Sequence, residues 1–318
     1  MKISRYLNVV VVSVTALLSV ISYAHAEEDK NSRFSVEFQR DPDGKINPET
    51  YFPQKWNDNW YSGLFYKDTS SFSSDTLGGI TESKIGTSID DRRIRLNMIS
   101  YSDNVGSVKY SMGVNVQRID INKNEFGYVH LVTTTPAINS WVAIDNRVKI
   151  GVNSFALQGD MTMGGDKETP YMVRVGVIVA PVNSLSLTQE TDFRPLVATT
   201  GTSSATSAQK LNWEATLETR YRATEWLSVG FDARYEVLPL KYQIAQLNST
   251  LDGFLPTDIE STDTTTRFGI KFIVKRKDKE THPLIGIANE TVNSKDEISG
   301  TSTKTSRVLF LIGLTGQF

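Results

Sequence analysis

The sequence predicts an all-β fold: a single transmembrane antiparallel β-barrel of about twelve strands, with short periplasmic turns and longer extracellular loops. Three observations predict it. Segments that alternate strictly between apolar and polar residues recur along the chain, the connections between them alternate in length, and the chain ends on an apolar strand whose last residue is aromatic. We therefore expect the barrel to occupy residues 59–318.

The first 26 residues have the features of a signal peptide. Lys2 and Arg5 give a positive start, residues 7–20 are apolar, and Ala24 and Ala26 fit a small-residue cleavage site. The apolar run is short for a membrane-spanning helix, which needs about 20 residues. We expect export and cleavage after Ala26, and because the chain has no cysteine, disulfides and thiolate metal sites are excluded.

Residues 27–58 form the least regular part of the mature chain. Phe34, Val36 and Phe38 alternate with polar residues and favour a short strand, while residues 41–45 have turn composition. The acidic residues of this turn lack the glycine position and the distant glutamate of a calcium loop, so no metal site is expected. The segment is interpreted as a periplasmic segment or as a plug in the lumen.

Residues 211–237 are read as a β-hairpin with a turn near residues 223–225. Trp213, Leu217 and Tyr221 share one face of the first strand, whereas Glu214, Glu218 and Arg220 share the other. An alternation of period two places the two sets on opposite faces of a sheet. Apolar residues outside and charges inside are expected of a strand that crosses a bilayer around a wet interior. The aromatic residues near the strand ends are expected at the two membrane interfaces: Trp213, Tyr221, Trp226 and Tyr235.

Similar segments follow the hairpin pattern along the chain, each near the 9–11 residues that a tilted spanning strand needs. The predicted strands lie within residues 60–67, 92–101, 107–118, 126–144, 147–156, 171–180, 185–193, 211–222, 226–237, 266–275, 284–292 and 305–318.

The connections between these strands alternate in length. Short connections are predicted at residues 102–106, 145–146, 181–184, 223–225 and 276–283. Long connections, rich in Ser, Thr, Gly and Asp, are predicted at residues 68–91, 119–125, 159–170, 194–210, 239–265 and 293–304. Long loops gathered at one end are typical of outer-membrane barrels, in which they are extracellular.

The last strand carries a family resemblance. Val308, Phe310, Ile312 and Leu314 share one face, and the chain ends at Phe318. This ending resembles that of bacterial outer-membrane β-barrel proteins, and the resemblance implies that the insertion machinery reads Phe310 and Phe318. It also implies outer-membrane localisation and contact with outer-membrane lipids, without indicating a particular family within the class.

The inward charges give the only functional indication. Basic residues outnumber acidic ones on the predicted inner faces, which favours anions in a water-filled lumen. The function expected is a porin-like channel for passive diffusion of small polar or anionic solutes. Pairing of these charges across strands is the open alternative, with Glu218 beside Arg234 and Asp232 beside Arg220. The candidates for the lumen or its constriction are Arg174, Glu218, Arg220, Asp232, Arg234 and Lys271.

Catalysis, cofactors and nucleic-acid binding are not expected. His130 and His282 are the histidines that remain after cleavage, and neither lies in a serine-nucleophile or metal-binding motif. The net charge of −2 and the lack of a basic stripe give no indication of nucleic acid. The second functional hypothesis is a non-conducting barrel with a structural or adhesive role through its extracellular loops.

Overall fold

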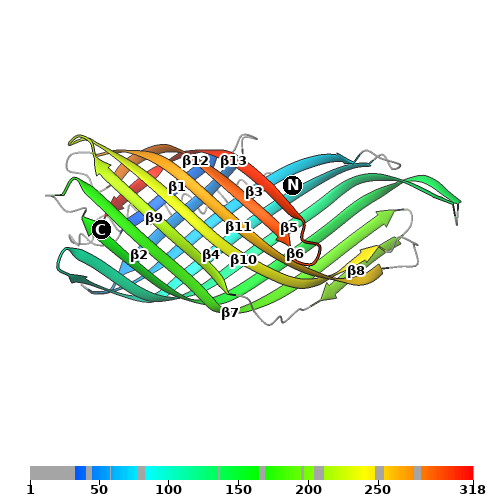
Figure 1. The fold of residues 1–318 in the computed structure, drawn as a ribbon, viewed down its shortest axis with the longest axis horizontal. Helices are drawn as coiled ribbons and strands as arrows, with labels where there is room; N and C mark the ends of the chain where they lie inside the picture. The colour runs from blue at the N-terminus through cyan, green and yellow to red at the C-terminus, as the bar shows by residue number, and fades with distance from the viewer. Residues whose placement is uncertain are drawn as a thin grey trace.

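The computed structural model describes residues 33–40, 45–57, 59–77, 83–134, 137–164, 169–194, 197–203, 211–247, 254–275 and 281–317. Within these ranges the ordered elements are β-strands (Figure 1). None of the described residues belongs to a helix long and apolar enough to cross a membrane. The predicted signal peptide, residues 1–26, lies outside the described ranges.

The strands differ widely in length, from 7 to 28 residues. Their bounds are β1 Arg33–Arg40, β2 Ile46–Lys55, β3 Trp60–Leu77, β4 Ser83–Val105, β5 Val108–Thr134, β6 Ala137–Gly164, β7 Tyr171–Arg194, β8 Val197–Ser203, β9 Asn212–Arg222, β10 Leu227–Leu247, β11 Phe254–Val274, β12 Thr281–Asp296 and β13 Ser302–Gln317.

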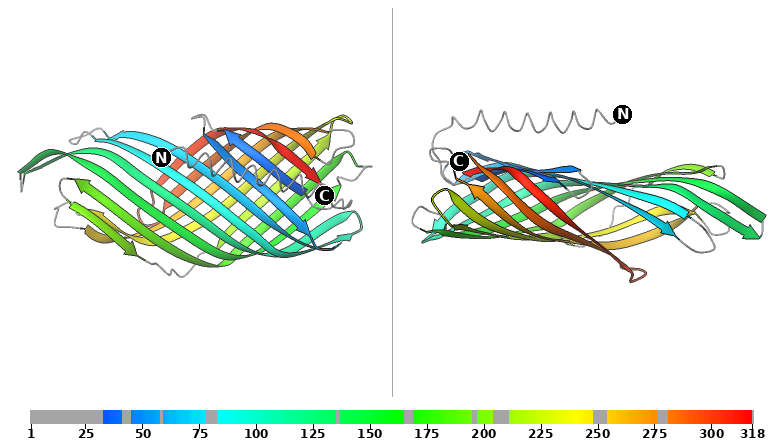
Figure 2. Two further views of the ribbon diagram at one scale, coloured as in Figure 1. Left: turned by 180° about the vertical axis from the view of Figure 1, so that it is seen from behind. Right: turned by 90° about the horizontal axis from the view of Figure 1, so that it is seen from above.

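Twelve of these strands form a closed antiparallel barrel, which confirms the predicted fold. The hydrogen-bonded order runs from β6 back through β5, β4, β3, β2 and β1 to β13, and then through β12, β11, β10 and β9 to β7. Pairing of β6 with β7 closes the ring, and β8 pairs with β7 outside it. Figure 2 shows the strands winding obliquely around the long axis of the barrel. Closure satisfies the backbone hydrogen bonds that lipid cannot provide.

The two ends of the barrel are distinct. The start of β1, the end of β13 and the turn between β9 and β10 lie at one end, which we name the terminal end. At the opposite, distal end, β5, β6, β7 and β10 run far beyond the last paired residues of β9 (Figure 1). The barrel wall is therefore much longer on one side than on the other.

An apolar belt surrounds the terminal part of the barrel. Its outward side chains follow the period of two that the sequence predicts, as in β7, where Val173, Val175 and Val177 are exposed and the inward Met172 is buried. Exposed apolar residues of the belt include Leu96, Met112, Val116, Phe155, Leu157, Phe231, Phe268, Ile270, Phe272, Ile285, Ile287, Val308, Phe310 and Ile312. Such a face suits the hydrocarbon core of a bilayer.

Toward the distal end the pattern reverses on the same strands. On β5, the outward residues change from Met112 and Val116 to Arg118, while the inward residues change from Asn115 to Ile119. The inward residues of this distal part form a buried cluster of Ile119, Val148, Ile150, Val152, Leu185, Leu187, Leu238 and Leu240, with Ile121 and Tyr242 packed against it. The outer surface around this distal apolar cluster carries polar residues such as Arg118, Asp120 and Lys149, with exposed Phe126, Tyr128 and Trp141 farther along β5 and β6.

The reversal explains the main error in the predicted strands. The predicted turn at residues 145–146 lies inside β6, and the predicted turn at 181–184 lies inside β7. The predicted long connections at 119–125 and 159–170 fall largely within β5 and β6, and residues 126–144 are divided between those two strands. Polar residues such as Asp145 and Asn146 have turn composition but lie within a long strand of the distal wall. In β7 the irregularity near Pro181 is a β-bulge opposite Phe155 and Leu157.

The prediction that residues 27–58 form a periplasmic segment or a plug is also wrong for most of these residues. β1 and β2 lie in the barrel wall, where β1 pairs with β13 and with β2. The total of about twelve strands is correct because these two missed strands offset the two that the false turns created. The first and last strands of the described chain, β1 and β13, pair with each other, with Phe38 opposite Ile312.

Candidate functional site

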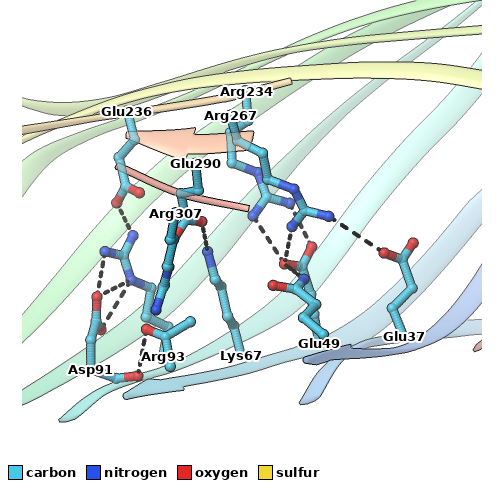
Figure 3. Close-up of polar contacts among 12 residues, drawn as sticks. Glu37, Glu49, Lys67, Asp91, Arg93, Arg234, Glu236, Arg267, Glu290 and Arg307 are labelled. Atoms are coloured by element: carbon cyan, nitrogen blue, oxygen red, sulfur yellow. Dashed lines mark hydrogen bonds and ion pairs between the residues drawn. The ribbon is translucent and has the colours of Figure 1, made fainter. Parts of the chain in front are cut away.

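Charged side chains meet across the lumen in its middle. Glu49 on β2 accepts hydrogen bonds from Arg234 on β10, at 2.8 Å from Nη2, and from Arg267 on β11, at 3.0 Å (Figure 3). β2 is not adjacent to β10 or β11 in the ring, so these bonds join opposite walls. Gln39 donates a further hydrogen bond to Glu49 at 3.1 Å.

Two further sets of ion pairs bridge the lumen beside Glu49. Lys67 on β3 lies 3.1 Å from Glu290 on β12, which also accepts from Arg307. Arg93 on β4 pairs with Glu236 on β10 and, at 2.7 Å, with its own strand's Asp91. Figure 3 shows these residues reaching toward one another from facing strands.

A fourth set lies nearer the terminal end. Lys271 Nζ lies 2.6 Å from Glu37 Oε1 and 3.2 Å from Asp232 Oδ1, so its ammonium is held between two carboxylates. Gly269 leaves room for this arrangement, because a Cβ at that position would lie 2.7 Å from Asp232 Oδ1. We call the bridging residues the central network: Glu37, Glu49, Lys67, Asp91, Arg93, Arg95, Glu214, Asp232, Arg234, Glu236, Arg267, Lys271, Glu290 and Arg307.

The six predicted lumen residues all point inward, but they are paired. Arg234 pairs with Glu49 and Glu214, and Asp232 with Lys271 and Arg267, so neither takes the partner expected from the sequence. Glu218 pairs with Arg220 on its own strand, at 3.3 Å. Arg174 on β7 pairs with Asp160 on β6, at 3.2 Å.

The charges in these inner ion pairs are balanced. Among the described residues they comprise nine cations, Lys67, Arg93, Arg95, Arg174, Arg220, Arg234, Arg267, Lys271 and Arg307, and nine anions, Glu37, Glu49, Asp91, Asp160, Glu214, Glu218, Asp232, Glu236 and Glu290. The excess of basic residues expected from the sequence is absent from this set, partly because Lys149 lies exposed on the outer face of β6. This arrangement gives no electrostatic reason for anion preference.

A cavity of about 250 Å³ lies inside the barrel between the central network and the terminal end. Its lining includes Glu49, Arg95 and Arg234 of the network, and also Arg220, Leu284 and Thr315 near the strand ends at the terminal end. We name this cavity the vestibule. The distal apolar cluster lies beyond the network, so the lumen contains a cavity, a charged barrier and an apolar barrier in series.

The predicted interface aromatics lie on the outer surface. Trp213 and Tyr235 contact each other with ring centroids 5.2 Å apart, close to the reversal on β10 between Val237 and Leu238. Tyr221 and Trp226 are exposed at the terminal end of the same hairpin. These positions border the apolar belt on its two sides, and their role at the membrane interface stays a prediction. Phe310 is exposed on β13, whereas Phe318 lies outside the described residues.

Glu37, Glu49 and Lys67 of the network are not among the predicted lumen residues. Glu37 and Glu49 fall in residues 27–58, the predicted periplasmic segment or plug, whereas Lys67 is the last residue of the predicted strand at 60–67. The alternation of Phe34, Val36 and Phe38 with Ser35, Glu37 and Gln39 was the available signal. It places Glu37 and Gln39 on one face, which is the inner face of β1.

His282 lies in β12 near the terminal end, and His130 lies in β5 opposite Trp141. Across the described ranges no three His, Cys, Asp or Glu side chains gather closely enough to hold a metal ion.

No family model matches the chain, and no curated protein has significant sequence similarity to it. Solved structures similar to it include the toluene transporter TbuX of Ralstonia pickettii, with 11% identity, a TM-score of 0.41, and coverage of 92% of this chain and 90% of that one. The P. putida toluene transporter TodX has 10% identity and a TM-score of 0.39, with 92% and 91% covered. The outer-membrane protease OmpT of Escherichia coli has 10% identity and a TM-score of 0.35, with 91% and 94% covered. Similarity of this extent carries no information on substrate or activity.

The class of the protein follows from its own architecture. A closed antiparallel ring of twelve strands has an apolar belt outside and a charged interior. The chain is a β-barrel of the bacterial outer-membrane class.

Proposed function

We propose that the protein is an outer-membrane transport barrel for small polar solutes that is closed at rest. The closed state replaces the porin-like channel for passive diffusion of small polar or anionic solutes that the sequence predicts. Passage requires the central network to separate and the distal apolar cluster to move. The vestibule is the part of the route that is already formed.

The observation that carries this proposal is the set of ion pairs between opposite walls. Lys67 with Glu290, Arg93 with Glu236, and Arg234 with Glu49 each join strands that are not neighbours in the ring. Hydrogen-bonded pairs at these distances occupy the space through which a solute would pass.

The composition of the barrier supports a transport role over a purely structural one. An interior that only needs filling is served as well or better by apolar side chains, because burying charges costs desolvation energy. Ionisable residues within membrane-spanning segments tend to mark solute or ion pathways. Glu37 Oε2 and two nitrogens of Arg267 are buried without a hydrogen-bond partner among the described residues, which indicates that the network is not a fully satisfied core.

Conductance in planar bilayers tests the proposal. We expect the wild-type barrel to be silent. A variant that weakens both barriers, Glu49→Ala and Arg234→Ala with Ile150→Ala and Leu240→Ala, should show stable openings, because it removes one cross-lumen pair and two side chains of the apolar cluster. The matched control is Arg118→Ala with Asp120→Ala, an ion pair on the outer surface of β5, which should stay silent.

Two outcomes contradict the proposal. Stable openings of the wild-type barrel would show that the interior is not closed. A correctly folded four-residue variant that stays silent would show that other side chains fill the lumen, as in a structural barrel.

The distal wall favours a second candidate function. Its outer surface presents charged residues such as Arg147 and Lys241 together with exposed aromatic residues, over a separate apolar core. A structural or adhesive role would use this surface, and it predicts that cell attachment is lost on altering exposed residues such as Arg147 and Lys241 while conductance is unchanged. Attachment that is insensitive to these changes would count against it.

A further inference from the structure

The vestibule carries equal numbers of charges of both signs. Its lining contains five acidic residues, Glu37, Glu49, Glu214, Glu218 and Asp232, and five basic residues, Arg95, Arg174, Arg220, Arg234 and Lys271. Apolar groups such as Tyr51, Phe65 and Ile178 complete the lining. A solute with a net charge would leave one sign in excess in this cavity, whereas a solute with both charges would not.

One wall already binds an ammonium group. Glu37 and Asp232 converge on Lys271 Nζ at 2.6 Å and 3.2 Å. Glu37 Oε2 makes no hydrogen bond among the described atoms, although Arg267 Nη2 lies 3.6 Å away, and Glu37 as a whole is 6% exposed. This oxygen can still accept a hydrogen bond from a second ammonium or from water.

The neighbouring wall presents guanidinium groups. Arg220 donates to Glu218 through Nη2 at 3.3 Å, but its Nε is buried without a hydrogen-bond partner in the described part of the chain. Arg174 lies directly opposite Glu218 in the pairing of β7 with β9, so two guanidinium groups flank one carboxylate. A guanidinium group suits a carboxylate ligand because it offers several donors in one plane.

The two polar regions are close enough for one small molecule. Arg220 on β9 is paired with Gly230 on β10, and Asp232 is two residues further along β10. Side chains at such diagonal positions start about 7–8 Å apart. The cavity of about 250 Å³ is slightly below the usual size of small-molecule pockets, which begin near 300 Å³. It therefore suits a ligand of about the size of an amino acid.

We propose that the vestibule binds small zwitterionic solutes, with the ammonium at Glu37 and Asp232 and the carboxylate at Arg220. The inference rests on the proposed transport function, because it names the class of solute that enters the formed part of the route. The balanced lining selects against related molecules that carry only one of the two charges.

Equilibrium dialysis with the detergent-solubilised barrel tests this selection. The probes are L-leucine, L-leucine methyl ester, which lacks the carboxylate, and N-acetyl-L-leucine, which lacks the ammonium. Leucine should bind best of the three. Arg220→Gln and Glu37→Gln should each weaken leucine binding by about tenfold, as expected for the loss of a hydrogen bond to a charged group.

Matched controls separate binding from folding. Arg118→Gln and Glu225→Gln alter exposed residues away from the vestibule and should leave leucine binding unchanged. Arg220→Lys keeps the positive charge and should retain more binding than Arg220→Gln. Equal binding of the three probes, absence of leucine binding, or unchanged binding in both glutamine variants would overturn the inference.

The leucine-binding test of the zwitterion site and the conductance test of the proposed transport function can fail independently. Selective leucine binding by a barrel whose four-residue variant does not conduct would keep the site and reject transport. Conductance of that variant without selective binding would reject the zwitterion site alone.

Discussion

Arg267 shows how the lumen stabilises charge at the scale of one residue. Its side chain is 2% exposed and lies 3.0 Å from Glu49, 3.6 Å from Glu37 and 3.8 Å from Asp232. Three carboxylates around one guanidinium offset the desolvation that burial imposes on it. The same carboxylates depend on Arg267, because Lys271 and Arg234 alone leave an excess of negative charge among them.

Replacement of Arg267 tests this dependence. Arg267→Met keeps much of the side-chain volume but leaves buried carboxylates short of a partner, and we expect a loss of about 3–5 kcal/mol in the free energy of unfolding. Urea unfolding of the barrel in detergent, followed by tryptophan fluorescence, measures it.

The control for this change is Arg118→Met, which breaks an exposed pair with Asp120 and should cost at most about 1 kcal/mol. The double variant Arg267→Met with Glu49→Gln removes one negative charge as well and should be more stable than Arg267→Met alone. Equal losses for Arg267→Met and Arg118→Met would contradict the role assigned to the network.

At the scale of the element, β7 passes from a lipid-facing to a water-facing surface. Val173, Val175 and Val177 are outward before the bulge near Pro181, whereas Ser184 and Ser186 are outward after it. The inward residues change in the opposite sense, from Arg174 to the buried cluster residues Leu185 and Leu187. The outer face of β7 is therefore apolar before the bulge and polar after it.

Two single arginine substitutions on β7, one before the bulge and one after it, distinguish the lipid-facing surface from the water-facing surface. Val175→Arg puts a charge in the apolar belt and should destabilise the lipid-inserted barrel by about 2–4 kcal/mol. Ser184→Arg puts the same charge on the distal outer surface, where it stays in water, and should change stability by less than about 0.5 kcal/mol. Unfolding in lipid vesicles measures both, and similar losses would show that the belt is misplaced.

The distal apolar cluster should behave as a core of its own. Ile119 is fully buried in it, so Ile119→Ala should cost about 2–5 kcal/mol through lost burial and the cavity left behind. Amide hydrogen exchange should accelerate in residues 147–153 and 184–188 but not in residues 171–179.

Asp120→Ala, on the outer face of the same strand, is the matched control and should leave exchange unchanged. Faster exchange throughout the barrel after Ile119→Ala would mean that the distal wall is not a separate unit.

The strands show which parts of the fold could be predicted from the sequence. Alternation identified the lipid-facing residues correctly where apolar residues point outward, as in the hairpin of β9 and β10 and in β13. It could not assign the distal parts of β5 and β6, because a period of two is the same whether apolar residues face lipid or an inner core. Asp145 and Asn146 have turn composition, yet a water-exposed strand accommodates them.

In the candidate site, the inward orientation of charged residues was predictable from the sequence, but their ion-pair partners were not. Inward charges such as Arg174 and Arg234 follow from alternation within one strand. Their partners lie across the lumen on strands distant in sequence, as Glu49 does from Arg234. Pairing across a barrel depends on ring closure and stagger, which local sequence does not encode.

At the scale of the whole molecule, the barrel combines a formed cavity with two barriers. The vestibule is bounded by the central network, and the distal apolar cluster lies beyond it. Balanced pairs hold the network together without favouring anions. In the proposed transport function, a solute would bind in the cavity, and its passage would require both barriers to move.

Cysteine labelling tests the closed lumen most directly, because the chain contains no cysteine of its own. Thr216→Cys places a thiol in the vestibule, while Thr224→Cys and Ser299→Cys place thiols at the terminal-end and distal turns as orientation markers. In proteoliposomes treated from outside with a membrane-impermeant maleimide, the two markers report the fractions of barrels with each end outward. We predict that Thr216→Cys is labelled to the same fraction as Thr224→Cys. Complete labelling of Thr216→Cys in both orientations would show a continuous path and contradict the closed barrel.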